Sequence, residues 1–381
     1  MNRKLLQRME KVLALREADG LLRTLKVRFA NDSQINLADN DYLNLSHDGE
    51  VIAASISALK QWGASASASP LVTGYTSLHQ ELEIILAQWH GYAHGLILNT
   101  GFSANTAVLG GLPQKGDIVL ADKLIHASML EGILSSEATL RRFPHNDLDT
   151  LESMLEESKE SDAVVFVVTE SVYSMDGDCP DLSRISKLKE RYNFCWVLDE
   201  AHATGWHGQT GSGMQEEQGV RAAADIVVGT LGKALGSQGA YVLCHDVLIK
   251  NMIINFAAEF IYSTYLNPAS VAAGLAAITR TKSLTNERAQ LHQLSRDWRA
   301  ALRMAGFTAP DFHSPIIPLI IGEVKKTQHY AVALRSAGFI VSVIRPPTVP
   351  VNTARIRISL RRGLNSTHLE KFISTLKGVT L

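Results

Sequence analysis

The chain has 381 residues, of which 46% are hydrophobic and 20% charged, and its formal net charge is −1. This composition is typical of a globular protein with a large core and about two domains, and the balanced charge does not indicate a nucleic-acid partner. No stretch has the length and apolarity of a membrane span or a signal peptide. Three sparse cysteines, Cys179, Cys195 and Cys244, have no metal-ligand spacing and predict reduced thiols in a cytoplasmic protein.

The first hundred residues are predicted to alternate helices with short strands. Apolar residues at helical spacing from Leu5 to Leu13 predict an amphipathic helix that ends before Gly20. The run 63–70 contains only small residues and proline, which predicts a loop that lies close to another group. The other expected elements are strands over 34–38 and 96–98 and helices over 51–62 and 79–89.

A turn with phosphate-binding character follows the strand over 96–98. The sequence Asn99-Thr100-Gly101-Phe102 leads into an expected helix of small residues over 106–111. A strand that turns through glycine into a helix offers free backbone N–H groups and the positive end of the helix dipole. Such a turn suits a phosphate group, but many α/β proteins have one without a ligand.

The middle of the chain alternates apolar strands with helices. Continuous apolar strands are typical of a parallel sheet that is covered on both faces, and the alternation predicts an α/β fold. The expected strands are 117–121, 163–168, 194–198, 226–228 and 240–243, and the expected helices are 126–135 and 147–160.

The last part of the chain mixes short strands with helices. We expect helices over 268–278 and 286–304, then strands over 316–320, 339–343 and 354–359 among two further helices. The predicted organisation is an N-terminal segment 1–40, a large domain 41–280 and a small α+β domain 281–381.

Lys233 does not resemble an ordinary surface lysine. It lies between small residues directly after an apolar strand, in Thr230-Leu231-Gly232-Lys233-Ala234. Desolvation in a tight pocket lowers the pKa of an ammonium group and frees the amine as a nucleophile. We hypothesise that Lys233 forms an imine with a carbonyl cofactor; the alternative is a loop lysine beside glycine turns.

Polar residues follow four of the predicted strands, at 99–102, 171–178, 199–202 and 230–233. In an open α/β sheet such strand ends converge on one crevice. An aldehyde cofactor with a pyridine ring and a phosphate would use all of them. Asp199 would keep the ring nitrogen protonated, His126 would stack on the ring and His202 would donate to its oxygen. Thr230 and the turn at Gly101 and Phe102 would take the phosphate.

Other chemistries fit these residues less well. A nucleotide P-loop is excluded because Gly229 and Gly232 are too close and Ala234 replaces the hydroxyl that would hold magnesium. A metal site from Asp199, His202 and His207 is conceivable, but it lacks an HExxH arrangement and leaves Lys233 without a role. Taken singly, Asp199 is equally well explained as a helix cap and His202 as a loop histidine.

The order Asp199-Glu200-Ala201-His202, then Thr230-Leu231-Gly232-Lys233, resembles the fold-type-I pyridoxal-phosphate enzymes and, among them, the α-oxoamine synthases. The resemblance runs nearly end to end and implies pyridoxal 5′-phosphate as cofactor. It also implies a mostly parallel central sheet and a homodimer with active sites at the subunit interface. The other matching motifs are Asn40-Asp41-Tyr42-Leu43, Ser103-Ala104-Asn105, His126-Ala127-Ser128, Ser174-Met175-Asp176-Gly177-Asp178 and Ile261-Tyr262-Ser263-Thr264.

Two stretches indicate which members of that family the chain resembles most. Residues 140–147 and, more specifically, Arg345-Pro346-Pro347-Thr348-Val349-Pro350 resemble the members that act in biotin biosynthesis. Those members condense L-alanine with a pimeloyl thioester, carried by acyl carrier protein or CoA, to give 8-amino-7-oxononanoate and carbon dioxide. The nearest alternative is glycine C-acetyltransferase chemistry, and a different class is a non-catalytic protein of this fold that only binds a partner.

The resemblance also implies a role for individual residues. Lys233 would carry the cofactor and move protons at the alanine α carbon, and Arg357 would bind the alanine carboxylate. The remaining roles are Asp199 at the pyridinium, His202 at the ring oxygen, His126 on the ring face and beside the substrate, Ser174 and Thr230 as cofactor supports, Gly101 and Phe102 on the phosphate side, Asn40 and Thr348 along the substrate path, and Ser263 and Thr264 reaching the phosphate from the partner subunit.

Two departures from the family pattern stand out. Members often carry a glycine-rich run where this chain has serine and alanine over 65–70, so we expect a stiffer loop. The family also places a substrate-binding arginine near the N-terminus, and Arg23 aligns with it within one position.

Overall fold

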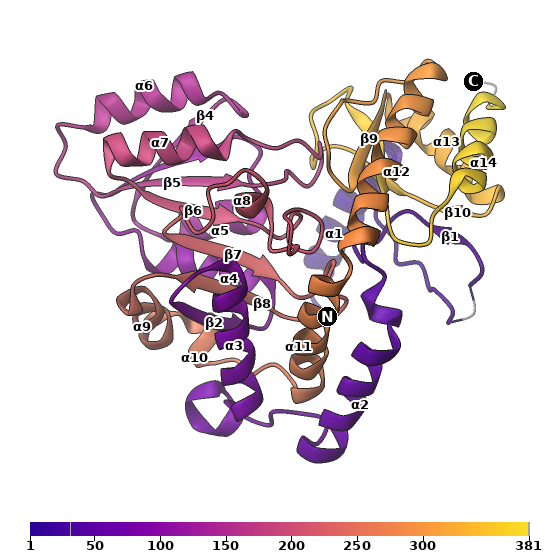
Figure 1. The fold of residues 1–381 in the computed structure, drawn as a ribbon. Coiled ribbons are helices and arrows are strands. Elements are labelled where there is room, and N and C mark those ends of the chain that lie inside the picture. Colours follow the sequence, from indigo (N-terminus) through magenta and orange to yellow (C-terminus); the bar gives the residue numbers. More distant parts are fainter. Residues whose placement is uncertain (31, 380–381) are drawn as a thin grey trace.

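The computed structural model describes residues 1–30 and 32–379, and its strands form one large sheet and two small ones (Figure 1). The large sheet has seven strands from residues 94–244, whereas the strands of the three-stranded sheet come from residues 316–359. The predicted α/β class with a mostly parallel central sheet is confirmed. Within the described residues, no helix is both long and apolar enough to cross a membrane.

The N-terminal helix α1 (Arg3–Ala18) forms as predicted, but it lies on the surface. The side chain of Asn2 caps it by accepting from the N–H groups of Lys4 and Leu5. None of its residues is buried. Its apolar side chains are therefore exposed, namely Leu5, Leu6, Met9, Val12, Leu13 and Leu15.

The segment before the large sheet contains β1 (Ile35–Asn36), the 3-10 helix η1 (Leu45–His47), α2 (Gly49–Trp62), the π-turn η2 (Pro70–Gly74) and α3 (Ser77–His90). The run 63–69 is a loop, as predicted, and the carbonyl of Ala68 accepts from the N–H of Tyr265 at 2.9 Å. Gly74 is required at the end of this loop because a Cβ there would collide with the Ala68 carbonyl.

The strands of the large sheet are almost all parallel. Only β8 runs against its neighbours β2 and β7, and the strand order is β2-β8-β7-β6-β5-β3-β4. The strand bounds are β2 (His94–Leu98), β3 (Ile118–Asp122), β4 (Thr139–Phe143), β5 (Val165–Glu170), β6 (Cys195–Asp199), β7 (Ile226–Thr230) and β8 (Ala240–Cys244). The sequence did not predict β4, because this edge strand carries arginines instead of an apolar run.

Helices cover the two faces of this sheet (Figure 1). Their bounds are α4 (Gly101–Gly111), α5 (Ala127–Ser135), α6 (Leu148–Ser158), α7 (Leu182–Tyr192), α8 (Met214–Glu217), α9 (Val247–Phe256), α10 (Ala258–Ile261) and α11 (Pro268–Ser283). The predicted start of α4 at residue 106 was wrong by five residues. The helix begins at Gly101 because Thr100 and Ser103 form a capping box, which satisfies N–H groups of the first turn.

The C-terminal elements gather on one side of the molecule, drawn in orange and yellow (Figure 1). They are α12 (Thr285–Met304), β9 (Ile316–Gly322), α13 (Val324–Ser336), β10 (Phe339–Ile340), β11 (Ser342–Ile344), β12 (Ala354–Ser359) and α14 (Ser366–Lys377). The expected strand over 339–343 is split, because β10 pairs with β1 while β11 pairs with β12. The division at residues 40 and 280 stays a prediction, although β1 is tied to the C-terminal part.

Candidate active site

The carboxyl ends of β5, β6 and β7 lie side by side, as expected for neighbouring parallel strands. They end at Glu170, Asp199 and Thr230, and the register pairs Glu170 with Asp199. Lys233 follows β7 by three residues. The polar side chains of three strand ends are thus brought to one edge of the sheet.

The turn that carries Lys233 is closed by its own backbone. The N–H of Gly236 donates to the Lys233 carbonyl at 2.9 Å, and the N–H of Ser237 donates to the Leu231 carbonyl at 2.9 Å. Gly236 has φ +60°, and a Cβ there would collide with the backbone of Ser46, so the turn needs glycine. Burial lowers the pKa of Lys233 to about 8, although the neighbouring carboxyl groups of Asp199 and Glu170 act in the opposite direction. About a tenth of the amine is therefore uncharged at pH 7.

Asp199 is buried and accepts two hydrogen bonds. One oxygen accepts from the side-chain amide of Asn105 at 2.9 Å, and the other accepts from the N–H of Ala201 at 2.8 Å. The same amide of Asn105 donates to the Ser128 hydroxyl at 3.0 Å. Sequence reasoning placed Asn105 in a family motif but gave it no role, and that motif was the available signal.

His126 is the N-cap of α5 and is joined to this network. Its Nδ1 lies 2.7 Å from the Ser128 hydroxyl, which connects it through Asn105 to Asp199. Burial lowers the pKa of His126, and the nearby Asp199 only partly opposes this shift. The imidazole is therefore neutral at neutral pH, and its ring is fixed by a hydroxyl of its own helix.

His202 is buried beside Tyr42, a residue to which sequence reasoning gave no role. Its Nδ1 lies 2.7 Å from the Tyr42 hydroxyl, which also lies 3.2 Å from Oδ1 of Asn40. Burial holds the pKa of His202 well below its usual value, and burial also raises the pKa of Tyr42 to about 12. Both side chains are therefore neutral near pH 7.

Arg357 on β12 joins the C-terminal sheet to the strand ends. Its guanidinium donates to the Ser174 carbonyl at 2.6 Å, to Oδ1 of Asn40 at 3.0 Å and to the Ser359 hydroxyl at 2.9 Å. It is only 4% exposed, and it has no carboxylate partner among residues 1–30 and 32–379. A buried guanidinium that is bound only to neutral oxygens is suited to a carboxylate ligand.

Arg23 and Thr348 meet, although they are far apart in the sequence. The Arg23 guanidinium donates to the Thr348 hydroxyl at 3.3 Å. Both residues line a cavity of about 690 Å³ between the N-terminal segment, α13 and β11, together with Lys26, Arg335 and Arg345. The structure therefore brings two of the expected substrate residues, Arg23 and Thr348, to one basic cavity.

The start of α4 lies near the loop that precedes α11. The N–H groups of Gly101 and Phe102 have no acceptor inside the helix, because they belong to its first turn. The side chain of Asn99 donates to the Thr264 carbonyl at 2.7 Å, so Thr264 and its neighbour Ser263 approach this helix end within one chain. The Thr230 hydroxyl is held by the Gly239 carbonyl at 3.0 Å.

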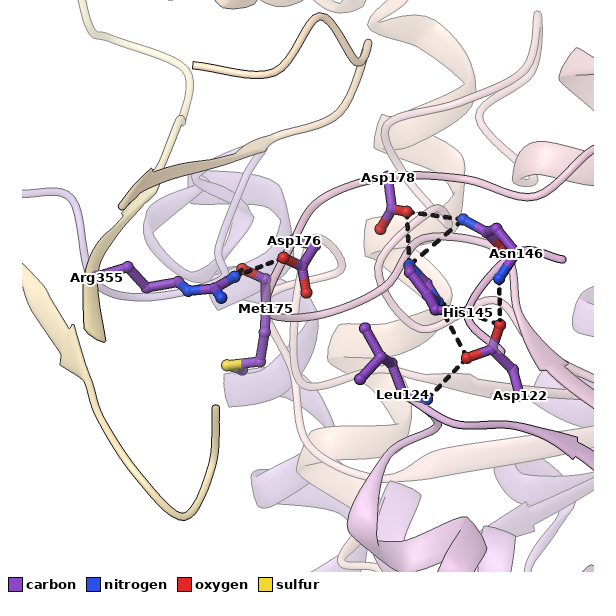
Figure 2. Close-up of polar contacts among 8 residues, drawn as sticks. All are labelled: Asp122, Leu124, His145, Asn146, Met175, Asp176, Asp178 and Arg355. Carbon is purple, nitrogen blue, oxygen red and sulfur yellow. Dashed lines mark hydrogen bonds and ion pairs between the residues drawn. The ribbon is translucent and has the colours of Figure 1, made fainter. Parts of the chain in front are cut away.

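A second buried polar cluster fastens the loop that carries Ser174 (Figure 2). His145 lies between two carboxylates, with Nδ1 3.0 Å from Asp122 and Nε2 2.7 Å from Asp178. Burial alone would lower the pKa of His145, but the hydrogen bonds to Asp122 and Asp178 outweigh burial and raise that pKa to about 10. Asn146 donates to the same two carboxylates, from its backbone and from its side chain.

The same loop is also held by the C-terminal sheet (Figure 2). Arg355 on β12 donates to the Asp176 carboxylate at 2.5 Å and to the Met175 carbonyl at 3.2 Å. Asp176, His145 and Arg355 each lie in one of the motifs named in the sequence analysis, but the sequence alone did not predict their contacts. Their contacts join residues far apart in sequence, which no local pattern reports.

Comparisons with known proteins agree with this geometry. The model of the family described as aminotransferase class I and II matches residues 32–376. A serine palmitoyltransferase from S. paucimobilis, solved with a bound adduct of pyridoxal phosphate and myriocin, has TM-score 0.91, 26% identity and 98% coverage of both chains. The chain belongs to the class I and II aminotransferase family.

Individual relatives within that family carry the name of one particular enzyme. The chain is 39% identical to the 8-amino-7-oxononanoate synthase of Photobacterium profundum, over 99% of this chain and 98% of the relative. It is 39% identical to the enzyme of the same name from Chlorobaculum parvum, over 91% and 89%. The solved 8-amino-7-oxononanoate synthase of Francisella tularensis has TM-score 0.79 and 28% identity, covering 91% of this chain and 98% of that one. The resemblance drawn from the sequence is confirmed.

The residues at this site fit pyridoxal phosphate. The partly neutral amine of Lys233, the hydrogen-bonded carboxylate of Asp199 and the neutral imidazole of His126 come together at the strand ends. The start of α4 adds N–H groups for a phosphate. These are the groups that an aldehyde, a pyridine nitrogen, a ring face and a phosphate require.

Proposed function

We propose that this protein is a pyridoxal-phosphate-dependent acyltransferase that condenses L-alanine with a pimeloyl thioester. The products are 8-amino-7-oxononanoate, carbon dioxide and the free carrier, as in biotin biosynthesis. The names of relatives that are 39% identical over nearly the whole chain support this assignment. The observation that carries it is the partly buried Lys233 with a lowered pKa, placed with Asp199 at neighbouring strand ends.

The cofactor would be held by Lys233, Asp199, His126 and His202, with the start of α4 on its phosphate side. Ser174 and Thr230 are proposed to support it. Ser263 and Thr264 are proposed to reach the phosphate of the partner subunit's site, while the Thr264 carbonyl accepts from Asn99 of its own chain. When bound, pyridoxal phosphate supplies an electron-withdrawing ring that stabilises negative charge at the amino-acid α carbon.

The protein side chains would provide the proton transfers and the orientation. Lys233 is proposed to remove and return the proton at the α carbon, because its lowered pKa lets the amine act as a base near neutral pH. Asp199, which is oriented by its two hydrogen bonds, would face the ring nitrogen and keep it protonated. The neutral His126 would cover the ring face and shield it from water.

Arg357 is proposed to bind the alanine carboxylate. Its guanidinium is buried, is oriented by Asn40 and Ser174, and is bound only to neutral oxygens. A carboxylate would add a charge-assisted pair of hydrogen bonds in place of neutral ones. Arg23 and Thr348, which meet in the basic cavity, are proposed to contact the acyl substrate.

We further propose a homodimer, with the second copy covering α1. Six apolar side chains of this helix are exposed, and Leu25, Val27 and Phe29 continue the apolar surface beyond it. An exposed apolar area of this kind marks an interface. The free cysteines and the absence of a membrane-spanning helix in the described residues are compatible with a cytoplasmic enzyme.

Turnover of defined substrates tests this function. The purified protein should bind pyridoxal phosphate, turn yellow, and form 8-amino-7-oxononanoate from L-alanine and pimeloyl thioester. Replacing L-alanine by glycine and the donor by acetyl-CoA tests the glycine C-acetyltransferase alternative, and supplying pimeloyl groups on CoA or on acyl carrier protein identifies the carrier. Failure of the wild-type protein to take up pyridoxal phosphate would refute the proposal.

A further inference from the structure

Glu170 is a buried acidic residue of the site for which the proposed reaction has no use. It is the last residue of β5, and it pairs in register with Asp199 at the end of β6. Residues paired in register on neighbouring strands point to the same face of the sheet. Two carboxyl groups are therefore placed next to each other at the strand ends, both almost completely buried, with Glu170 at 3% exposure and Asp199 at 7%.

The two carboxyl groups differ in their hydrogen bonds. Asp199 accepts from Asn105 and from the N–H of Ala201. Oε1 of Glu170 is buried and has no hydrogen-bond partner among the residues that the structure describes. Two neighbouring buried carboxyl groups resist joint ionisation. A buried carboxylate oxygen without a hydrogen-bond partner is also far more costly than the oxygen of a buried neutral acid. The proton of the pair therefore belongs on Glu170.

The surroundings of Glu170 link it to the proposed machinery. Charged and titratable groups face it from four elements: Asp199 on β6, Lys233 after β7, Asp122 on β3 and Tyr173 after β5. The charge of Lys233 and the backbone N–H of His126, at the start of α5, each act to lower the pKa of Glu170. Burial, with Asp199 adding to it, raises the pKa of Glu170 well above its ordinary value.

We propose that Glu170 is a positioning residue that stays protonated, supports the backbone at His126, and leaves Asp199 as the single anion facing the cofactor nitrogen. This inference rests on the proposed function only for its catalytic consequence. If Glu170 were ionised, its charge would raise the pKa of Lys233 and compete with Asp199 for the positive charge of the ring. A neutral Glu170 does not raise the pKa of Lys233, and it does not compete with Asp199 for the positive charge on the ring nitrogen.

The protonation state can be measured without turnover. Infrared difference spectra of the holoenzyme, wild type minus Glu170→Gln, should contain the C=O band of a protonated carboxyl group at neutral pH. Glu81→Gln, which replaces an exposed glutamate of α3, should give carboxylate bands instead. Carboxylate bands for Glu170 would overturn the inference even in a fully active enzyme. A wild-type protein that fails to condense alanine would refute the function while leaving the Glu170 band in place.

The pH dependence of folding stability provides a second test of whether Glu170 is protonated. A buried acid with a raised pKa stabilises the fold fully below its unfolded pKa, and that contribution is lost as pH rises toward the folded pKa. The folding constant of the wild type relative to Glu170→Gln should therefore fall by up to about tenfold per pH unit above about pH 4.3. Urea unfolding across this range measures the ratio, and a ratio that does not change with pH would contradict the inference.

The positioning role is tested by comparing two variants. Glu170→Gln keeps the shape and neutrality of the acid, so it should lose no more than about threefold in kcat, with an unchanged pH profile. Glu170→Ala should lose about tenfold or more in kcat, with little change in KM, because His126 loses its support. The visible circular dichroism of the bound cofactor should change in the alanine variant and recover in the glutamine variant. A glutamine variant as impaired as the alanine variant, or an alanine variant as active as the wild type, would overturn the role.

Discussion

The molecule contains two polar clusters in which the pKa values of the histidines are shifted in opposite directions. At the strand ends, His126 and His202 are bound by hydroxyl groups, and burial lowers both pKa values. In the second cluster, His145 lies between Asp122 and Asp178, and these hydrogen bonds raise its pKa to about 10. Burial acts on all three rings, so the neighbours decide the charge.

This difference separates a site prepared for a ligand from one that holds the structure together. Both carboxylates around His145 accept hydrogen bonds from His145 and Asn146, so the cluster has charge pairs of its own and ties the loop of Ser174 to the sheet. The guanidinium of Arg357 is buried and the side chain of Lys233 is partly buried, and among the described residues neither forms an ion pair with a carboxylate. Cationic groups without a carboxylate partner are available to bind a ligand.

We expect the largest effect on activity when the nucleophile Lys233 is removed from the site at the strand ends. Lys233→Ala should lower kcat at least about a thousandfold, because both the covalent attachment and the proton transfer depend on this amine. The fold should persist, since the Lys233 turn is closed by backbone hydrogen bonds. Activity assays and the absorbance of bound cofactor measure the effect, with Lys159→Ala on the surface as a control. Retained turnover in the Lys233 variant would contradict the assignment.

The next prediction concerns the cluster formed by His145, Asp122 and Asp178. His145→Gln leaves Asp122 and Asp178 without their cation and should reduce the free energy of unfolding by about 2 kcal/mol, allowing for the partial exposure of His145. His329→Gln, an exposed histidine of α13, is the matched control.

The same substitution has a defined pH dependence. Because the folded pKa of His145 lies above the unfolded value, its stabilisation is complete below about pH 6.5 and is lost as pH rises toward about 10. Urea unfolding of the wild type should lose this contribution over that window, and His145→Gln should not. Equal pH profiles for the two proteins would show that His145 is not charged in the fold.

A pH titration of cofactor uptake sharpens the comparison. Only the neutral amine of Lys233 can attack an aldehyde, so the uptake rate of cofactor-free protein should rise about tenfold per pH unit below a midpoint near 8. Stopped-flow absorbance measures the rate. A midpoint near the ordinary lysine value of about 10.4 would show that the site does not depress this pKa.

The smallest effect concerns the partner of His202. Tyr42→Phe removes a hydroxyl group that lies 2.7 Å from Nδ1 and should cost about 1 kcal/mol, or roughly fivefold in kcat. The absorbance maximum of the bound cofactor should shift slightly with the environment of His202. An unchanged kcat and spectrum would show that Tyr42 only fills space.

Local sequence determined much of this protein. The apolar runs that became β5, β6 and β7 identified a covered parallel sheet, and Asp199, His202 and Lys233 followed from their places after those strands. Strands and helices are set by patterns within a few residues, so they can be read without the fold. The charged edge strand β4 and the early start of α4 were missed because each lacks an apolar run or depends on a cap.

Only the tertiary structure decided how the polar residues are paired. The contacts of Asn105 with Asp199, of Tyr42 with His202, and of Arg357 with Asn40 and Ser174 each join residues that are distant in sequence. Burial and neighbouring charges then set which groups are ionised, and so distinguish His145 from His126 and Glu170 from Asp199. Desolvation and Coulomb interactions depend on distance in space, which the order of residues along the chain does not specify.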